Sequence, residues 1–192
     1  MRCFTLQLLV VVLLSGCLAP PPAVRVQKPP AEVEDDISVY FSPHGGAMAA
    51  ILKTIGQAQS SIDVQAYLVT SQEIVDALKA AHSRGVAIRI VIDKNNMGGV
   101  YSYEAFFAKS GIPIWRDGQH KDLHDKVMLI DGKTIITGSF NFTQQSEDTN
   151  SENLLIIRNK PKLFAAYEEH FEIHLHHSDP PPATGPVGNW KE

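Results

Sequence analysis

Cysteine is almost absent from this sequence. Cys3 and Cys17 are the only two among 192 residues, and both lie close to the N-terminus. The chain beyond Cys17 therefore has no thiol that could form a disulfide or bind a metal ion. Any active centre in that part of the chain must be built from other side chains.

The sequence also lacks an excess of positive charge. Its 17 Lys and Arg residues stand against 21 Asp and Glu residues, which gives a formal net charge of -4 and a pI of about 6.0. This balance excludes the broad basic surface by which many proteins hold nucleic acid. An anionic substrate would have to meet a local cluster of positive groups.

Long hydrophobic runs are missing as well. The longest, Leu6–Leu14, contains one polar residue and is shorter than the about 20 apolar residues that cross a bilayer. It follows Arg2 and precedes Leu14-Ser15-Gly16-Cys17, a pattern that resembles a signal peptide ending in a lipobox. We therefore expect residues 1–16 to be removed and lipid on Cys17 to anchor an exported, periplasmic or cell-surface lipoprotein to the membrane. A plain signal peptide with an incidental Cys17 is the alternative.

Proline-rich segments flank the expected domain. Residues 17–36 contain Pro20-Pro21-Pro22 and Pro29-Pro30 and end in an acidic stretch, which is typical of a solvated tether. Residues 178–192 contain three consecutive prolines and are expected to form a disordered tail. The folded domain should span residues 37–177.

Strand and helix patterns alternate within this domain. Strands are expected over 37–41, 62–69, 86–92, 112–115, 127–130, 134–137 and 153–157. Helices are expected over 47–58, from an N-cap at Ser71 to residue 84 with Gly85 as the stop, over 101–109 and over 161–174. This alternation predicts an α/β sandwich with helices on both faces of a central sheet.

A predicted hairpin holds the most informative residues. Two apolar runs surround Asp131-Gly132, a strong signal for a tight turn. If these two residues form the turn, Ile130 pairs with Lys133, although a one-residue bulge would change that register. Because side chains alternate along a strand, one face then carries four polar groups. They belong to His124, Lys126, Ser139 and Asn141.

These side chains suit displacement at phosphorus. A neutral imidazole at His124 can attack a phosphodiester and form a covalent phosphohistidine. Lys126 and Asn141 can donate hydrogen bonds to the phosphoryl oxygens, where negative charge accumulates. A carboxylate on the far ring nitrogen would fix the tautomer of the histidine. The pattern predicts a phosphodiesterase that needs no metal and no cofactor.

The residues His124-x-Lys126-x4-Asp131-x6-Gly138-Ser139-x-Asn141 resemble the HKD motif of the phospholipase D superfamily. Together with Phe41-Ser42-Pro43, the strand ending at Asp93 and Ser151-Glu152-Asn153, they resemble the Nuc-like subfamily of single-motif bacterial endonucleases over nearly the whole domain. The resemblance implies a phospholipase D-like sandwich with a central mixed sheet. It also implies that Glu152 supports the catalytic histidine. Asp131, placed in the turn, is expected to be structural.

The chemistry needs a second acid, yet the sequence contains one motif. Single-motif relatives supply two motifs by pairing two subunits, so the resemblance implies a homodimer with one shared active site. His120 or His44 could instead serve as the acid within a monomer.

Two further groups of residues carry weaker signals. Lys94, Arg116, His120 and Lys121 could form a positive rim for a polyanion, or be scattered surface charge. The histidines at positions 170, 174, 176 and 177 favour a solvated helix end over a metal site. No metal ligands are therefore assigned.

Three substrate hypotheses remain open. The first is a sequence-nonspecific endonuclease acting on DNA, and on RNA too, outside the cytoplasm. The second is a phospholipase D or cardiolipin-type hydrolase at the membrane, which the lipid anchor and acidic charge favour. The third is a non-catalytic nucleic-acid-binding protein, which the intact motif argues against.

Overall fold

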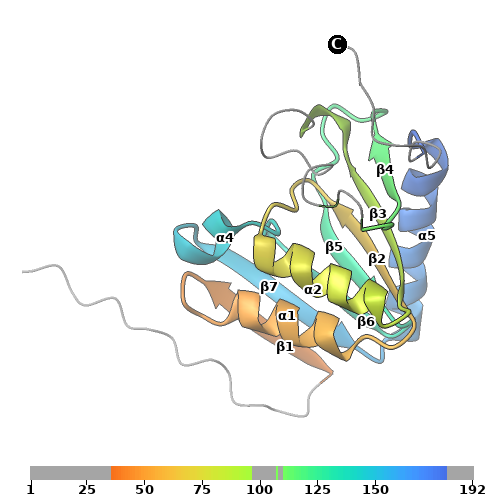
Figure 1. Cartoon of the computed structure of the whole chain (residues 1–192). Helices are drawn as coiled ribbons and strands as arrows, with labels where there is room; N and C mark the ends of the chain where they lie inside the picture. The colour runs from red at the N-terminus through yellow and green to blue at the C-terminus, as the bar shows by residue number, and fades with distance from the viewer. Residues whose placement is uncertain (1–35, 97–106, 108–109, 181–192) are drawn as a thin grey trace, which may run out of the picture.

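A seven-stranded mixed sheet organises the computed structural model, which describes residues 36–96, 107 and 110–180 (Figure 1). The strand order is β1-β7-β6-β5-β2-β3-β4. β2 pairs in parallel with β3, and β3 with β4, while the other neighbours are antiparallel. The strands are β1 Ile37–Ser42, β2 Ser61–Ala66, β3 Ala87–Asp93, β4 Ile114–Asp117, β5 Lys126–Ile130, β6 Thr134–Gly138 and β7 Glu152–Arg158.

The pairing registers bring several strand termini to one end of the sheet. The last residues of β1, β2, β3, β4 and β6 lie there, together with the first residues of β5 and β7. We call this the motif end, because Lys126 pairs with Ala66 there and Glu152 pairs with Ser42. Of the predicted site residues that the structure describes, all except Asp131 belong to strands or loops at this end.

Helices cover both faces of the sheet, as the sequence predicts (Figure 1). α1 (Ala47–Gln57) and α2 (Gln72–Ser83) pack on one face, where Ile51 and Leu78 join Ile90 in the larger apolar core. α5 (Pro161–His177) covers the other face, where Phe171 packs with Leu129. The predicted α/β sandwich with a mixed central sheet is confirmed.

The ends of α2 follow from its sequence. The Ser71 hydroxyl accepts a hydrogen bond from the backbone N–H of Ile74 at 3.4 Å, so Ser71 is the predicted N-cap. Gly85, with φ +93°, stops the helix at the other end. The short helix α4 (Gln144–Asp148) was not predicted, because its five residues are too few to show a periodic pattern.

Several predictions lie outside the described residues. These are the signal peptide, Cys17, the tether to residue 35, and the helix over 101–109 except for buried Phe107. Two residues beyond the predicted domain end at residue 177 contact the domain. The Ser178 hydroxyl donates to the carbonyl of His174, and the backbone of Asp179 pairs with that of Arg116. Among the described helices, none is long and apolar enough to cross a membrane.

One part of the α5 face stays uncovered in the described structure. α5 packs against β3, β4 and β5, at a distance from the outer strand β1. On that strand Ile37, Val39 and Phe41 alternate with inward-facing residues and are 52%, 41% and 45% exposed. This apolar stripe runs along β1 to Ser42, at the motif end.

Candidate active site

Lys126 is the buried cation of the motif end. Its side chain is 7% exposed, and Nζ donates to the His124 carbonyl at 2.6 Å and contacts His124 Nδ1 at 3.0 Å. The ring of Tyr67, just beyond β2, lies 4.7 Å from the His124 ring and 5.3 Å from Lys126 Nζ, measured to ring centroids. The lysine and the tyrosine together hold the exposed imidazole in place.

These contacts determine the tautomer of His124 in one chain. A protonated Lys126 can only donate hydrogen bonds, so Nδ1 accepts and a neutral ring carries its proton on Nε2. Attack on phosphorus through Nε2 needs the opposite tautomer, with the proton on Nδ1 and an acceptor beside it. A single chain therefore holds the ring but does not present Nε2 as a nucleophile.

Glu152 is engaged by other groups. Its Oε2 accepts from the Ser139 hydroxyl at 2.5 Å, and its Oε1 accepts from Asn150 Nδ2 at 2.9 Å. The Ser139 hydroxyl in turn accepts from the backbone N–H of Asn153 at 3.1 Å. Within the described part of one chain both carboxylate oxygens are thus bonded away from His124, and the supporting contact that the resemblance implies is not made there.

Electrostatics connects the two halves of the site. Burial lowers the pKa of Lys126, while the negative charges of Asp125 and Glu152 raise it less strongly. The effect of Glu152 requires its carboxylate to lie near the ammonium group. Lys126, His124, Ser139 and Glu152 therefore form one electrostatic unit at the motif end.

The predicted register of the hairpin is wrong by one residue. Ile130 pairs with Thr134 rather than Lys133, because the turn contains Lys133 as well as Asp131 and Gly132. The β5–β6 ladder ends at Met128, so pairing across a flat hairpin does not place the motif side chains. Beyond it, Gly138 adopts φ +150°, and a Cβ there would clash with the carbonyl oxygen of Asn153. The chain direction at Gly138 positions Ser139 beside β7.

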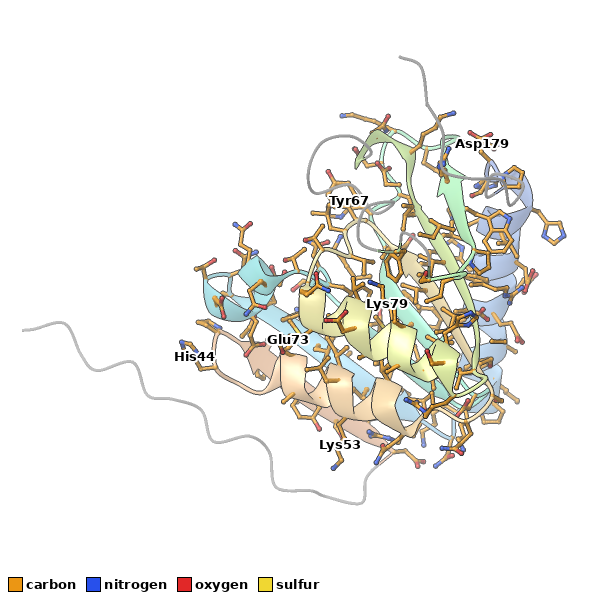
Figure 2. All side chains as sticks on the ribbon, in the orientation of Figure 1. His44, Lys53, Tyr67, Glu73, Lys79 and Asp179 are labelled. Carbon is orange, nitrogen blue, oxygen red and sulfur yellow. The ribbon has the colours of Figure 1, made fainter. Side chains whose placement is uncertain are left out.

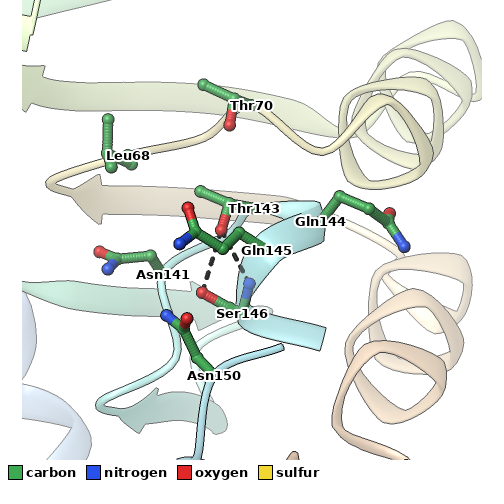
Figure 3. Close-up of a pocket in the computed structure, with 8 residues that line it drawn as sticks. All are labelled: Leu68, Thr70, Asn141, Thr143, Gln144, Gln145, Ser146 and Asn150. Carbon is green, nitrogen blue, oxygen red and sulfur yellow. Dashed lines mark hydrogen bonds between the residues drawn. The ribbon is translucent and has the colours of Figure 1, made fainter. Parts of the chain in front are cut away.

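Asn141 adjoins a pocket of about 300 Å³ (Figure 3). Its Oδ1 is buried and has no hydrogen-bond partner among the described residues. The lining is uncharged and includes Thr70, Gln145 and Asn150. Asn150 also donates a hydrogen bond to Glu152. An unpaired buried amide oxygen is costly, so a bound molecule that donates to Asn141 would relieve that cost.

Asp131 lies at the opposite end of the sheet, where it joins the hairpin to the start of β2. Its carboxylate accepts hydrogen bonds from the backbone N–H groups of Gln59, Ser60 and Ser61. Burial alone would raise its pKa, but these bonds outweigh burial and lower it. The contacts suit the structural role expected for this motif position.

The four rim residues lie at the motif end near β3 and β4, but two are engaged with acids. Lys94 forms an ion pair with Asp179 at 3.0 Å, and His120 contacts Asp117 at 3.2 Å. Lys121 is exposed, and its carbonyl accepts from Asn95. Figure 2 labels Asp179 and Tyr67, which lie on the same side of the molecule. The positive rim is weaker than the sequence suggested.

The expectation of a solvated histidine helix end is wrong for His174. This residue is 5% exposed, and its Nδ1 lies 2.5 Å from Oδ2 of buried Asp117. Burial lowers the pKa of His174, against the raising effect of Asp117. Burial alone would raise the pKa of Asp117, but hydrogen bonds from His177, His174 and His120 hold it well below its usual range.

Two contacts of the site, one between aromatic rings and one a hydrogen bond, were not predicted from the sequence. Tyr67 was assigned to the interior of a strand over 62–69, but β2 ends at Ala66, which frees Tyr67 to contact His124. Gln65 Nε2 donates to Asp125 Oδ2 at 2.9 Å and so holds the residue next to His124. An aromatic residue near a strand's carboxyl end was the available signal for Tyr67.

A histidine and a buried lysine side by side at one end of an α/β sheet suit chemistry on phosphate esters, because the ammonium can stabilise negative charge on a phosphoryl oxygen. Comparison with known proteins identifies the class. The family model described as "Cardiolipin synthase, PLD-like domain" matches residues 51–175. The chain therefore belongs to the phospholipase D-like family of phosphodiesterases.

Individual relatives agree with this family. The crystal structure of Nuc from Salmonella typhimurium, a phospholipase D family member, is 40% identical, with a TM-score of 0.73 over 77% of this chain and 98% of that one. A phospholipase D of Rickettsia prowazekii is 38% identical over 69% of this chain and 64% of its own length. A mitochondrial cardiolipin hydrolase of Chlamydomonas reinhardtii is 29% identical over 66% and 56%. The chain thus spans less than two thirds of the last two.

Proposed function

We propose that this protein is a metal-independent phosphodiesterase that uses His124 as its nucleophile through a phosphohistidine. The observation that carries the proposal is buried Lys126 bonded to His124, with the ammonium ready to meet a phosphoryl oxygen. Asn141, Ser139 and Glu152 complete the set of catalytic groups. Lys126 supplies the positive charge that a metal ion provides in other phosphodiesterases.

The active enzyme is proposed to be a homodimer with a shared site. One chain has one His124 for two roles, and among the residues that the structure describes no acceptor that would place the proton on Nδ1 contacts the ring. A second copy related by a two-fold axis supplies a second His124 as the leaving-group acid and a second Glu152 near the ring. His120 is a less suitable candidate for the acid of a monomeric mechanism, because its ring nitrogen faces Asp117 rather than His124.

The apolar stripe of Ile37, Val39 and Phe41 is a candidate dimer surface. It ends at Ser42, which pairs with Glu152, so a copy packed against it would lie close to the site. A Phe41→Glu substitution should weaken the dimer by placing a charge in this contact. Sedimentation would show it, with exposed Leu163→Glu on α5 as the matched control.

Nucleic acid is the proposed substrate. The pocket beside Asn141 is lined by amide and hydroxyl groups, which can hydrogen-bond to bases and sugars. The motif's likeness to single-motif endonucleases and the 40% identity to Nuc support the same choice. A phospholipid substrate is the second candidate, and the names of the Rickettsia and Chlamydomonas relatives favour it. A non-catalytic binding protein accounts least well for the desolvated Lys126.

The site of action is proposed to be outside the cytoplasm. The N-terminal pattern ending in Cys17 supports export and a lipid anchor at a periplasmic or outer surface. Mass spectrometry of the mature N-terminus would test this. An unmodified Met1 on the purified protein would contradict it.

One experiment separates the substrate candidates. Purified protein in EDTA is offered plasmid DNA and phospholipid vesicles that contain cardiolipin, with the His124→Ala variant as the control. We expect nicked and linear DNA from the wild type only. Cleavage of lipid without cleavage of DNA would favour the phospholipase over the nuclease. Cleavage of neither substrate would overturn the proposal that the protein is an enzyme.

A further inference from the structure

A second polar cluster lies at the motif end, between β4 and the end of α5. It consists of Asp117, His120, His174 and His177, and we call it the His/Asp cluster. One ring nitrogen of each histidine approaches the same carboxylate oxygen, Asp117 Oδ2, at 3.2, 2.5 and 3.0 Å respectively. One potential ligand atom from each of the four residues lies within 4.8 Å of the others.

The cluster uses the full acceptor capacity of one buried carboxylate. Three ring nitrogens approach Asp117 Oδ2, and that of His120 also lies 3.4 Å from Oδ1. Oδ1 accepts from the backbone N–H of Gln119 at 2.9 Å as well, so the about four lone-pair sites of the carboxylate are all taken. A cation among the four groups could replace the shared protons, because each neutral imidazole then presents a lone pair to the ion.

The ligand set and its dimensions suit a transition-metal ion. Imidazole nitrogen with carboxylate oxygen is a usual environment for zinc, with ligand bonds of about 2.0–2.2 Å. Ligand atoms around a tetrahedral ion of that size are about 3.3 Å apart. The four ligand atoms lie within 4.8 Å of one another, and those of His174 and Asp117 are 2.5 Å apart, so this spacing is within reach of small side-chain rotations.

The arrangement along the chain resembles a structural site. Asp117 and His120 come from the end of β4 and the following loop, and His174 and His177 come from the last turn of α5. Two ligands three residues apart thus face two others three residues apart across the fold. Because all four positions are protein ligands, no coordination position is left open for a reactant.

We propose that the His/Asp cluster binds one divalent transition-metal ion, zinc in the first place, and that the ion fastens the end of α5 to β4. This assigns ligands where the sequence suggested none. The cluster contains none of the proposed catalytic groups, so chelation should loosen α5 without removing one. A second set, Asp125 with His170 and His174, offers only three ligands, and Gln65 already binds Asp125.

Zinc titration of the full chain tests the proposal. The protein in detergent is stripped with a chelator, dialysed and titrated with ZnCl2 against a chromogenic competitor. We expect one zinc ion per chain. His120→Gln and His177→Gln should each weaken binding at least about tenfold. His120 is half exposed, so its replacement should not endanger folding.

His176→Gln is the matched control, because His176 is exposed and contacts only the backbone of its own helix. Its affinity for zinc should equal that of the wild type. Zinc should raise the unfolding temperature of the wild type and of this control, but not of His177→Gln. Equal zinc affinity in the wild type and His177→Gln, or an equal loss in His176→Gln, would overturn the site and identify adventitious binding to surface histidines.

Discussion

The His124 site and the His/Asp cluster lie at the same end of one sheet, yet they are polar in opposite ways. At the first, a buried ammonium lies beside an exposed imidazole. At the second, three imidazoles crowd around one buried carboxylate. The first is organised to receive an anion and the second a cation. The contrast shows that a histidine's role depends on the charge buried beside it, ammonium at one site and carboxylate at the other.

The largest expected effect is loss of the nucleophile. His124→Ala should lower turnover of a chromogenic phosphodiester by at least about a thousandfold, because direct attack by water on the diester is slow. His177→Gln in the other cluster should change turnover less than about threefold at a temperature well below unfolding. The turnover of Glu152→Ala should lie between those of His124→Ala and His177→Gln. Wild-type rates in His124→Ala would place the nucleophile elsewhere.

Subunit mixing tests whether one chain suffices. Wild-type chains are refolded with increasing His124→Ala chains, and activity per wild-type chain is measured. A shared site predicts a steep fall, approaching loss when most wild-type chains are in mixed dimers. Activity that stays level would make each subunit self-sufficient and give the acid role to His120 or another group.

Removing the buried cation should separate activity from stability. Lys126→Met should reduce turnover by about a hundredfold or more, since it removes a donor to the phosphoryl oxygen. It should also raise the free energy of unfolding by about 1 kcal/mol, because burial disfavours the ammonium, as its lowered pKa indicates. Lys133→Met, in the exposed turn, is the control and should change neither quantity.

The pH dependence of turnover should be bell-shaped. One His124 must be neutral to attack while its mate is protonated to donate, so loss of either state should lower the rate. Rates from about pH 4 to 9 should fall on both sides of a maximum. A single rise to a plateau would contradict paired acid and base roles.

The smallest effect on rate should come from chelation. EDTA should leave turnover at low temperature nearly unchanged, because Lys126 rather than a metal supplies the positive charge. It should lower the unfolding temperature by a few degrees in the wild type, and not at all in His177→Gln. Turnover lost in EDTA and restored by Mg²⁺ would disprove the metal-independent mechanism.

The sequence predicted the fold and the motif better than the contacts. Strand and helix periods are local, so α2 with its Ser71 cap and both hairpin strands could be placed from the sequence. The register at Ile130 could not, because a turn of two or three residues leaves the same apolar pattern. The burial of His174 could not either, since its partner Asp117 lies 57 residues away in the chain. The contact of Tyr67 could not be predicted, because the expected strand ended at residue 69, three residues beyond the end of β2.

Gly138 limits how the enzyme can be redesigned. A single methyl group there would collide with the backbone of Asn153, so β6 and β7 would have to separate. That movement would be transmitted directly to Ser139 and Glu152. A library meant to change substrate preference should therefore keep this glycine fixed and vary the pocket at Thr70 and Gln145, which are not among the proposed catalytic groups.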